Sequence, residues 1–527
     1  MNIDNKHRYM WLVGTAVAGF LALLSGILLS PVNHYLLAAI LVVGAICIYV
    51  LQVFSVADRN WLDFRAVFSG VWLGTIGLAA LRLAEYQKIW LNKTWFLLAL
   101  AYLVMQIGVT LGLRLAPAIC DRVTAGIRKI KVGKLYLKMN ANRLFGICVV
   151  TTLIGAACFG INIAIKGFVP AFSDIPNAYM YFYTKFHVFA VAAVAAAPLC
   201  YYCIATQPLS LPKKILLGLC IFYLVFAFPI LVVSRGVFVV AALGVAVCVY
   251  YLHGKKLWVF ILSVALIGAG YLFASELRNY TDEQMNIYFQ PAQIQLPGVT
   301  EATEPPETTN FVDATDSTAD STVGSGTADD STAPDSTTPD STAPDSTAPD
   351  STVPDSTVPN PKPERTFSLS PRMAFVYSYV TACHDNFNEA VANTKDFTWG
   401  IRQLMPFNVI LRISWISERR AEAEYYQVNP FLNSANILAD FYYDFGSWGV
   451  ALCMLLWAVI FGIVQGVYER SKNIFSLLIL GNTMVPVALS FFSMWLSTFS
   501  HWLIWGVALL LAAAAYVTLA PSKKKKS

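Results

Sequence analysis

Two arginines stand at the ends of long apolar segments, where their guanidinium groups are placed to bind phosphate. Arg235 lies in the three-residue connection Ser234-Arg235-Gly236 between two such segments, and Arg278 follows the next one. A planar guanidinium can donate to two phosphate oxygens at once, and an ionisable group at a membrane edge is a functional candidate. Two such groups would suit one pyrophosphate. The structural alternative is that Arg235 only extends toward lipid headgroups.

A second group of arginines lies between residues 367 and 445, where aromatic and aliphatic residues are interleaved with charged ones. This composition predicts a folded segment with short amphipathic helices, over Pro371 to Val391 and Phe407 to Ala423. Arg402 and Arg412 belong to it. The full predicted pyrophosphate-binding set is Arg235, Arg278, Arg402 and Arg412.

Two carboxylates and two glycines stand at the end of the same segment. Asp440 and Asp444 are four residues apart, so they would share one face of a helix. Gly446 and Gly449 follow, and glycines at this spacing let two helices approach closely.

The elements that must position these residues follow from the composition. The chain has 527 residues, of which 57% are hydrophobic and 13% charged, and its mean hydropathy is +0.56. It is therefore too apolar for a soluble protein of this length. Apolar stretches of about 17 residues or more recur, and each can cross a hydrocarbon core of about 30 Å as a helix.

The fold class predicted is an all-α polytopic membrane protein with about 12 transmembrane helices. The expected spans are Trp11 to Leu29, Tyr35 to Val53, Val67 to Leu83, Trp95 to Leu113, Leu144 to Ile165, Val188 to Ile204, Ile215 to Val233, Val237 to Leu252, Leu257 to Ala274, Gly446 to Val467, Ile474 to Trp495 and Trp502 to Ala520.

Lysine and arginine mark one side of this layout, because short loops rich in them stay in the cytoplasm. They crowd the N-terminal tail, every second connection and the C-terminal tail, as in Lys6 with Arg8, Arg122 to Arg143, Lys213 with Lys214, Lys255 with Lys256, and Lys523 to Lys526. Both termini are thus expected in the cytoplasm. The predicted location is a bacterial inner membrane, with Arg235 and Arg278 on its outer face.

Three regions are expected. Residues 1–274 hold membrane helices 1 to 9, residues 275–445 form a large outer loop between helices 9 and 10, and residues 446–527 hold helices 10 to 12 and a basic tail. Within the loop, residues 301–365 carry Asp-Ser-Thr-x-Pro repeats from Asp330 to Pro359 and are predicted to be disordered. Residues 366–445 are predicted to fold. The repeats are either an acidic spacer or acceptors for bacterial O-glycosylation, whose Asp-Ser/Thr-small pattern they resemble.

Several function classes are disfavoured by the sequence. The formal net charge of +5 is concentrated on one membrane side, where anionic lipid is a sufficient partner, so nucleic acid is not expected. No cluster of His, Asp and Glu has metal-ligand spacing, so neither a metal nor another cofactor is predicted. Cys200 and Cys203 form a C-x-x-C that is interpreted as two packing residues, because no second pair stands nearby in the sequence.

The ordered motifs resemble those of bacterial O-antigen and oligosaccharide repeat-unit polymerases of the Wzy type. They are Gly-Phe-Val-Pro-Ala-Phe at 167–172, Ser-Arg-Gly at 234–236, a large outer loop, and Asp-Phe-Gly-Ser-Trp-Gly at 444–449. The resemblance covers helices 5 to 10. One departure is Ala178-Tyr179, where many relatives carry Ala-Arg.

The resemblance implies transfer of a growing glycan from one undecaprenyl-pyrophosphate carrier to a sugar hydroxyl on the next lipid-linked unit. Arginines would stabilise the charge on the leaving pyrophosphate, and the acceptor hydroxyl needs a base. The candidate bases are Asp440, Asp444, His384 and Glu418. Expected partners are undecaprenyl-pyrophosphate-linked oligosaccharides, membrane lipid and a chain-length regulator.

Two alternatives remain open. O-antigen ligases resemble the same layout but carry a His-Asn pair where this chain has Ala435-Asn436, which favours a polymerase; His384 lies elsewhere in the loop. A transporter of lipid-linked sugars is the alternative from another class. It is disfavoured because the sequence shows no two halves with matching broken helices.

Overall fold

The computed structural model describes residues 3–276 and 371–519, apart from 57, 85, 130–134, 138–139, 176–177, 412, 423–424, 429–431 and 494. The chain divides into two units, residues 1–293 with 368–527 and residues 294–367. The second unit lies outside the described residues. The predictions made for Arg278, Arg412 and the repeats in residues 301–365 therefore fall outside the described part of the chain.

The first unit is built from helices, with one short antiparallel strand pair, β1 (Leu135–Leu137) with β2 (Val517–Leu519). The α-helices are α1 (Ile3–Leu24), α2 (Gly26–Leu29), α3 (His34–Ser55), α4 (Phe64–Ala80), α5 (Asn92–Lys129), α6 (Ala141–Lys166), α7 (Ala178–Tyr181), α8 (Lys185–Ala193), α9 (Ala196–Thr206), α10 (Leu211–Phe222), α11 (Phe228–Leu231), α12 (Arg235–Leu252), α13 (Leu257–Glu276), α15 (Pro371–Asn393), α16 (Ile401–Leu411), α17 (Ser414–Glu422), α18 (Ile437–Ser471), α19 (Ile474–Ala488) and α20 (Phe499–Tyr516). Short turns of other helix types are η1 (Pro170–Phe172), η2 (Tyr223–Ala227) and η3 (Trp495–Ser497).

Eight helical segments among the described residues are long and apolar enough to cross a membrane. They occupy eight of the twelve expected positions, from His7–Leu29 to Ile437–Ser471. Four further expected spans are apolar helices of fewer than 18 residues: Phe64–Ala80, Leu257–Phe273, Ile474–Ala488 and Phe499–Ala515. The protein is thus an all-helical membrane protein in its described part, as predicted from composition, while the count of twelve stays a prediction.

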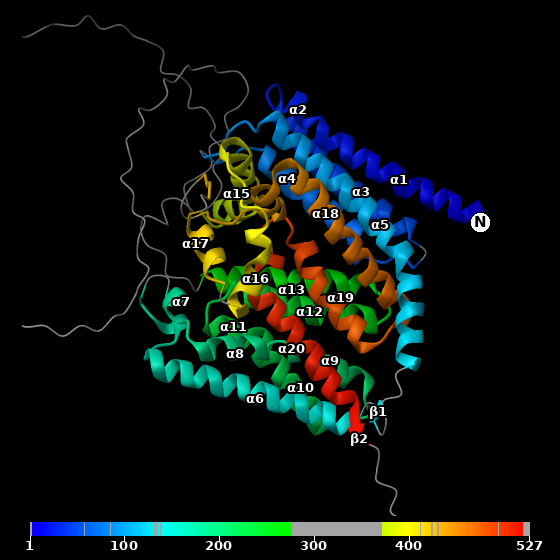
Figure 1. Ribbon diagram of the computed structural model, residues 1–527, viewed down its shortest axis with the longest axis vertical. Coiled ribbons are helices and arrows are strands. Elements are labelled where there is room, and N and C mark those ends of the chain that lie inside the picture. The colour runs from blue at the N-terminus through cyan, green and yellow to red at the C-terminus, as the bar shows by residue number, and fades with distance from the viewer. Residues whose placement is uncertain are drawn as a thin grey trace, which may run out of the picture. The chain divides into compact units, whose positions relative to one another are not determined.

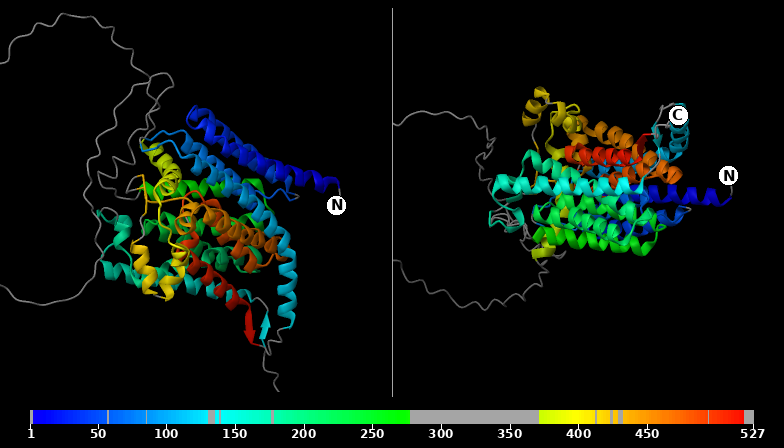
Figure 2. Two further views of the ribbon diagram at one scale, coloured as in Figure 1. Left: turned by 45° about the horizontal axis from the view of Figure 1, so that its top comes forward. Right: turned by 90° about the horizontal axis from the view of Figure 1, so that it is seen from below.

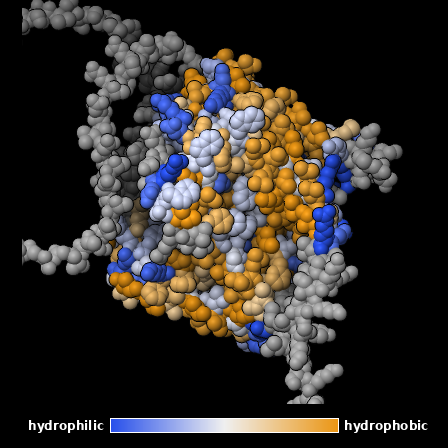
Figure 3. Space-filling view, viewed as in Figure 1, coloured by the Kyte–Doolittle hydropathy of each residue, from blue (hydrophilic) through white to orange (hydrophobic). Residues whose placement is uncertain are grey.

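The helices of the first unit share one long direction. In Figure 1, α15, α16 and α17 (yellow) lie at one end of this bundle, and the start of α1 and the strands β1 and β2 lie at the other. In both views of Figure 2, α15 to α17 again lie at the opposite end from the start of α1. Figure 3 shows a broad apolar surface between polar side chains gathered at these two ends. This distribution is typical of a protein that crosses a bilayer.

The close contact of α5 with α18 depends on glycine. A Cβ atom at Gly112 would lie 2.2 Å from the carbonyl oxygen of Val459, and one at Gly462 would lie 2.2 Å from that of Val109. No side chain fits at such distances, so the two backbones touch. Small residues allow this approach in membranes, where packing replaces the hydrophobic effect as the force between helices.

Polar side chains buried between α3, α4 and α5 are paired with one another. Gln52 donates to Gln106 at 3.1 Å, and Ser69 donates to Gln52 at 2.9 Å and lies 3.0 Å from the hydroxyl of Tyr102. A hydrocarbon environment offers these groups no water, so each needs a partner inside the protein. The network holds the three helices in one register.

Replacing Gly462 with valine is expected to lower the free energy of unfolding by about 3 kcal/mol or more, because the valine forces α18 away from α5. The measurement is the thermal midpoint of the purified protein in detergent. Gly160→Val is the matched control, since a Cβ there meets nothing within 4 Å. Equal midpoints for the two variants would contradict the close approach.

Candidate functional site

The Ser234-Arg235-Gly236 connection has the form of a helix start. Val233 adopts a left-handed φ of 57°, which turns the chain out of α11. Ser234 then caps α12, its hydroxyl accepting from the backbone N–H of Val237 at 3.4 Å. Arg235 is the first helical residue, so its side chain position is fixed by the cap. A Cβ at Gly236 would lie 3.2 Å from the ring of Trp495, so this position needs a small residue.

Arg235 does not extend toward lipid headgroups. It is 5% exposed, and its guanidinium donates to the hydroxyl of Tyr379. The guanidinium carbon lies 4.1 Å from the ring centre of Tyr379, 5.4 Å from Tyr271 and 5.6 Å from Phe375. Contact of a cation with aromatic faces is favourable and strengthens when water is excluded. We call these three rings the aromatic box of Arg235; they come from α13 and α15.

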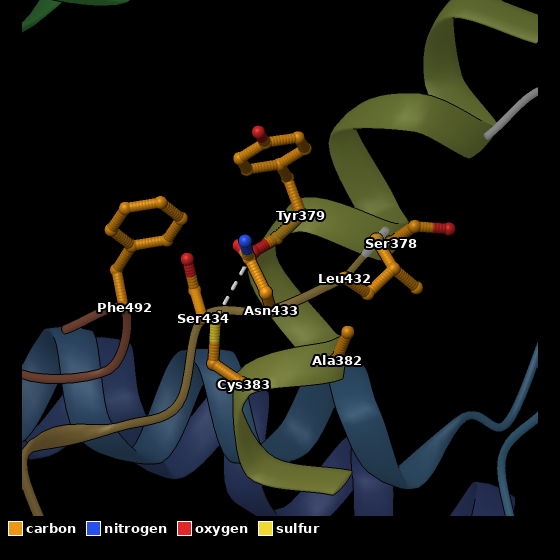
Figure 4. A pocket seen from close by; sticks show the side chains of 8 residues that line it. All are labelled: Ser378, Tyr379, Ala382, Cys383, Leu432, Asn433, Ser434 and Phe492. Carbon is orange, nitrogen blue, oxygen red and sulfur yellow. Dashed lines mark hydrogen bonds between the residues drawn. The ribbon is translucent and has the colours of Figure 1, made fainter. Parts of the chain in front are cut away.

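A small cavity of about 10 Å³ adjoins this box. Figure 4 shows that Tyr379 and Cys383 reach it from α15, Ser434 from the segment before α18, and Phe492 from the segment after α19. The ring of Phe492 stacks on that of Tyr379 with centres 5.7 Å apart. The cavity has room for about one water molecule, so it is not a substrate site.

Asp444 acts as the cap of α16. Its carboxylate accepts from the backbone N–H groups of Arg402 and Gln403, both at 3.1 Å, and from the hydroxyl of Thr398. A carboxylate at a helix N-terminus stabilises the unpaired N–H groups there. The side chain is fully buried, so Asp444 is held in a structural role and is poorly placed to act as a base.

Asp440 faces the same helix, as the four-residue spacing predicted. One carboxylate oxygen lies 3.8 Å from the Arg402 guanidinium, and the other accepts from Ser497 at 2.8 Å. Its side chain is 19% exposed. The guanidinium carbon of Arg402 lies 4.0 Å from the ring centre of Tyr443 and 5.5 Å from that of Tyr425. Arg402, like Arg235, is thus held against aromatic faces.

The two glycines after Asp444 lie at a break within α18. Gly446 has φ 63° and ψ −148°, which interrupts α18. A Cβ at this position would lie 2.8 Å from the ring of Phe397, and one at Gly449 would lie 2.2 Å from the carbonyl oxygen of Phe441, in the part of α18 before the break. Gly446 therefore allows a sharp break in α18, and Gly449 lets the two helical parts on either side of it approach closely.

His384 joins three elements. Its Nε2 lies 2.9 Å from the hydroxyl of Thr75 on α4, and its Nδ1 lies 3.2 Å from the amide of Asn436, which caps α18. The side chain is fully buried, and burial lowers its pKa to about 3. Both nitrogens are occupied, so His384 holds α15 against α4 and α18 and has no access to a substrate.

Glu418, the fourth candidate base, is exposed on α17. Of the eight residues named from the sequence, Arg278 and Arg412 lie outside the described part of the chain.

The segment η3 connects Arg235 with Asp440. Its first residue, Trp495, packs on Gly236, and its last, Ser497, donates to Asp440. The three residues of η3 therefore link the turn that carries Arg235 to Asp440, one of the candidate bases. Sequence reasoning passed over Trp495 and Ser497, because the expected helix 11 ran through Trp495, whereas α19 ends at Ala488.

Two larger cavities flank these residues. An apolar groove of about 580 Å³ lies between α3, α4, α12, α13 and α19, and its lining includes Gly70, Gly74, Leu78 and Phe491. A polar cavity of about 570 Å³ is lined by residues 393–398 with Arg402, Arg419, Tyr426 and Tyr443. Both have the size of sites that hold organic ligands. In the described part of the chain, no group of three or more His, Cys, Asp or Glu side chains is arranged to hold a metal ion.

A family model described as a predicted membrane protein, DUF2339, matches residues 12–526. No curated protein matches the chain. No solved structure matches it either. The comparisons thus agree with the membrane character of the helices, and the chemistry has to be argued from the side chains.

Asp385 is a buried carboxyl next to His384. It is 2% exposed, and it accepts from the indole of Trp90 at 2.7 Å and from the amide of Gln87 at 3.1 Å. Burial raises its pKa to about 7, although these two donors and Arg82 act in the opposite direction. Folding therefore favours the protonated form.

The stability of the protein should depend on pH through Asp385. Because its folded pKa of about 7 lies above the unfolded value of about 3.9, the stabilisation is complete below about pH 4 and is lost as the pH rises to about 7, by up to about 4 kcal/mol. Asp385→Asn should therefore flatten the fall of the thermal midpoint between pH 4 and pH 7. Asp174→Asn, at an exposed position, is the control. Parallel profiles for all three proteins would refute the assignment.

Proposed function

The chain belongs to the DUF2339 family of predicted membrane proteins, and we propose that it is a glycosyltransferase that polymerises polyprenyl-pyrophosphate-linked oligosaccharide units. In this proposal the chain crosses a bacterial inner membrane twelve times, with both termini in the cytoplasm and α15 to α17 on the outer face. The product is a surface polysaccharide such as O-antigen or capsule, and a chain-length regulator is an expected partner.

The observation that carries the proposal is a series of aromatic contacts that runs from the apolar groove to Arg235. Phe491 lines the groove, its ring centre is 6.2 Å from that of Phe492, and Phe492 stacks on Tyr379, which holds Arg235. These contacts lead from an apolar groove to a cation, so a ligand with a long hydrocarbon chain and an anionic headgroup is complementary to them. Both parts of a polyprenyl pyrophosphate then have complementary surfaces.

The groove is suited to a lipid chain in length as well as in polarity. Its lining on α4 runs from Val67 to Leu78, which is about 16 Å along a helix at 1.5 Å per residue. Gly70 and Gly74 keep this side of α4 open. The hydrocarbon would lie along α4 and bring its headgroup to the outer end of the bundle.

Arg235 would stabilise the leaving group. As the bond between the anomeric carbon and the pyrophosphate oxygen breaks, negative charge grows on that oxygen. A guanidinium that is already desolvated and oriented by its aromatic box loses little further freedom in meeting this charge. The position that the aromatic box fixes for the guanidinium, rather than its burial, is what supports this role.

Asp440 is the base in this scheme. The acceptor hydroxyl attacks the anomeric carbon, its proton passes to Asp440, and the pyrophosphate leaves with the bonding electrons. Among the described candidates Asp440 alone combines partial exposure with side-chain contacts, to Ser497 and to Arg402. Asp444 is occupied as a helix cap and His384 is buried.

A ligase that passes the glycan to a terminal acceptor is the second candidate. The observation that favours it is the contact of His384 with Asn436, which places in space the pair that ligases carry in sequence. Against it, His384 also contacts Thr75 and is fully buried. A polymerase is therefore the better supported of the two.

Arg235→Ala and Asp440→Asn are each expected to reduce glycan polymerisation by about 100-fold, because removal of a group that stabilises transition-state charge, or of a general base, typically costs about that much. The measurement is the ladder of surface glycan on electrophoresis, with each variant expressed in a deletion strain. A lost polymerase leaves single capped units, whereas a lost ligase leaves undecorated acceptor.

Arg114→Ala is the matched control, since this arginine also packs on a tyrosine ring, 5.2 Å from Tyr9, at the other end of the bundle. Arg235→Lys tests whether charge alone suffices and should recover only part of the activity. A full ladder from both Arg235→Ala and Asp440→Asn, at normal protein levels, would refute the proposal.

A further inference from the structure

The polar cavity beside Arg402 is separate from the groove. Its volume is about 570 Å³, and its lining comes from residues 393–398, from the start of α16, from α17 and from Tyr426 and Tyr443. It shares no lining residue with the apolar groove. A headgroup attached to a lipid chain in the groove therefore does not account for this cavity, which needs a ligand of its own.

Positive charge dominates its walls. Lys395, Arg402 and Arg419 line the cavity, and Asp396 is the one carboxylate among the lining residues. Lys395 and Arg419 are exposed, so their charges face the open side of the cavity. The nearby Asp444 is occupied by the N-terminus of α16. An anionic ligand is the complement of this arrangement.

The remaining lining is suited to a ring with hydroxyl groups. Phe397 and Tyr426 supply aromatic rings, Tyr443 supplies a third ring whose face packs on Arg402, and Asn393 supplies an amide group. Thr394 also lines the cavity, and within the described residues its buried hydroxyl has no hydrogen-bond partner. A buried hydroxyl without a partner is costly, and a ligand hydroxyl would satisfy it. Apolar faces combined with a few placed polar groups are typical of sites for small organic ligands.

We propose that this cavity binds a carboxylate-bearing sugar, of the uronic-acid class, in the acceptor glycan. Lys395 and Arg419 pair with the carboxylate, the aromatic rings contact the faces of the sugar ring, and Thr394 binds a ring hydroxyl. Arg402 lines this cavity and also lies 3.8 Å from Asp440, so this arginine connects the bound sugar with the candidate base. The inference rests on the proposed function for the identity of the acceptor, but the binding it describes can be measured without any transfer reaction.

The test measures binding of three probes to the purified full-length protein in detergent by isothermal titration calorimetry. The probes are trigalacturonate, neutral maltotriose and inorganic pyrophosphate. Trigalacturonate is expected to bind at least about tenfold more tightly than maltotriose, and its affinity should fall as salt rises. The Lys395→Gln/Arg419→Gln protein should lose about tenfold in trigalacturonate affinity, and Tyr426→Leu should weaken both saccharides.

Lys166→Gln/Lys185→Gln removes two charges outside the cavity and should bind trigalacturonate like the original protein. Equal affinity for the two saccharides, no trigalacturonate binding, or pyrophosphate binding that is lost in the Lys395→Gln/Arg419→Gln protein would each overturn the assignment. If trigalacturonate does not bind selectively but the glycan ladder still depends on Arg235 and Asp440, the acidic-sugar site is refuted and the polymerase proposal stands. If trigalacturonate binds selectively but the ladder does not depend on these two residues, the polymerase proposal is refuted and the acidic-sugar site stands.

Discussion

A guanidinium held out of water is the constraint around which the end of the bundle that carries α15 to α17 is arranged. Burying an arginine is costly unless its charge and its donors are matched. Three aromatic side chains meet that requirement at Arg235: one tyrosine accepts a hydrogen bond, and all three rings face the cation. Two of those rings belong to α15, so the loop helix and the membrane helices must be assembled for the arginine to be tolerated.

The same loop is tied to the membrane helices by polar contacts. His384 bridges α4 and α18, and Asp385 accepts from the connection between α4 and α5. At the other side of the site, Asp444 in the first part of α18 caps α16. Each contact satisfies a group that burial would otherwise leave without a partner. The site is thus held by hydrogen bonds from the segments around it, and Asp440 keeps partial access to solvent.

Much of the architecture could be predicted because it depends on local composition. Apolar length predicted helices at every expected membrane position in the described residues, and the spacing of Asp440 and Asp444 predicted that both face one neighbour. The role of Gly446 could not be predicted in this way. Glycine is compatible both with close helix packing and with a backbone break, and only the ring of Phe397 on one side decides between them.

The sequence by itself determined that the chain is a membrane protein and where most of its helices run, because hydropathy acts over a few residues. It placed Arg235 in a short connection, whereas the structure makes it the first residue of α12. The tertiary structure decided which charged groups meet. Arg235 is joined to Tyr379 across 144 positions of the chain, and Asp440 to Ser497 across 57. Such contacts follow from how helices pack, and no local pattern records them. For the same reason His384, a plausible base in the sequence, is a buried link between helices in the folded protein.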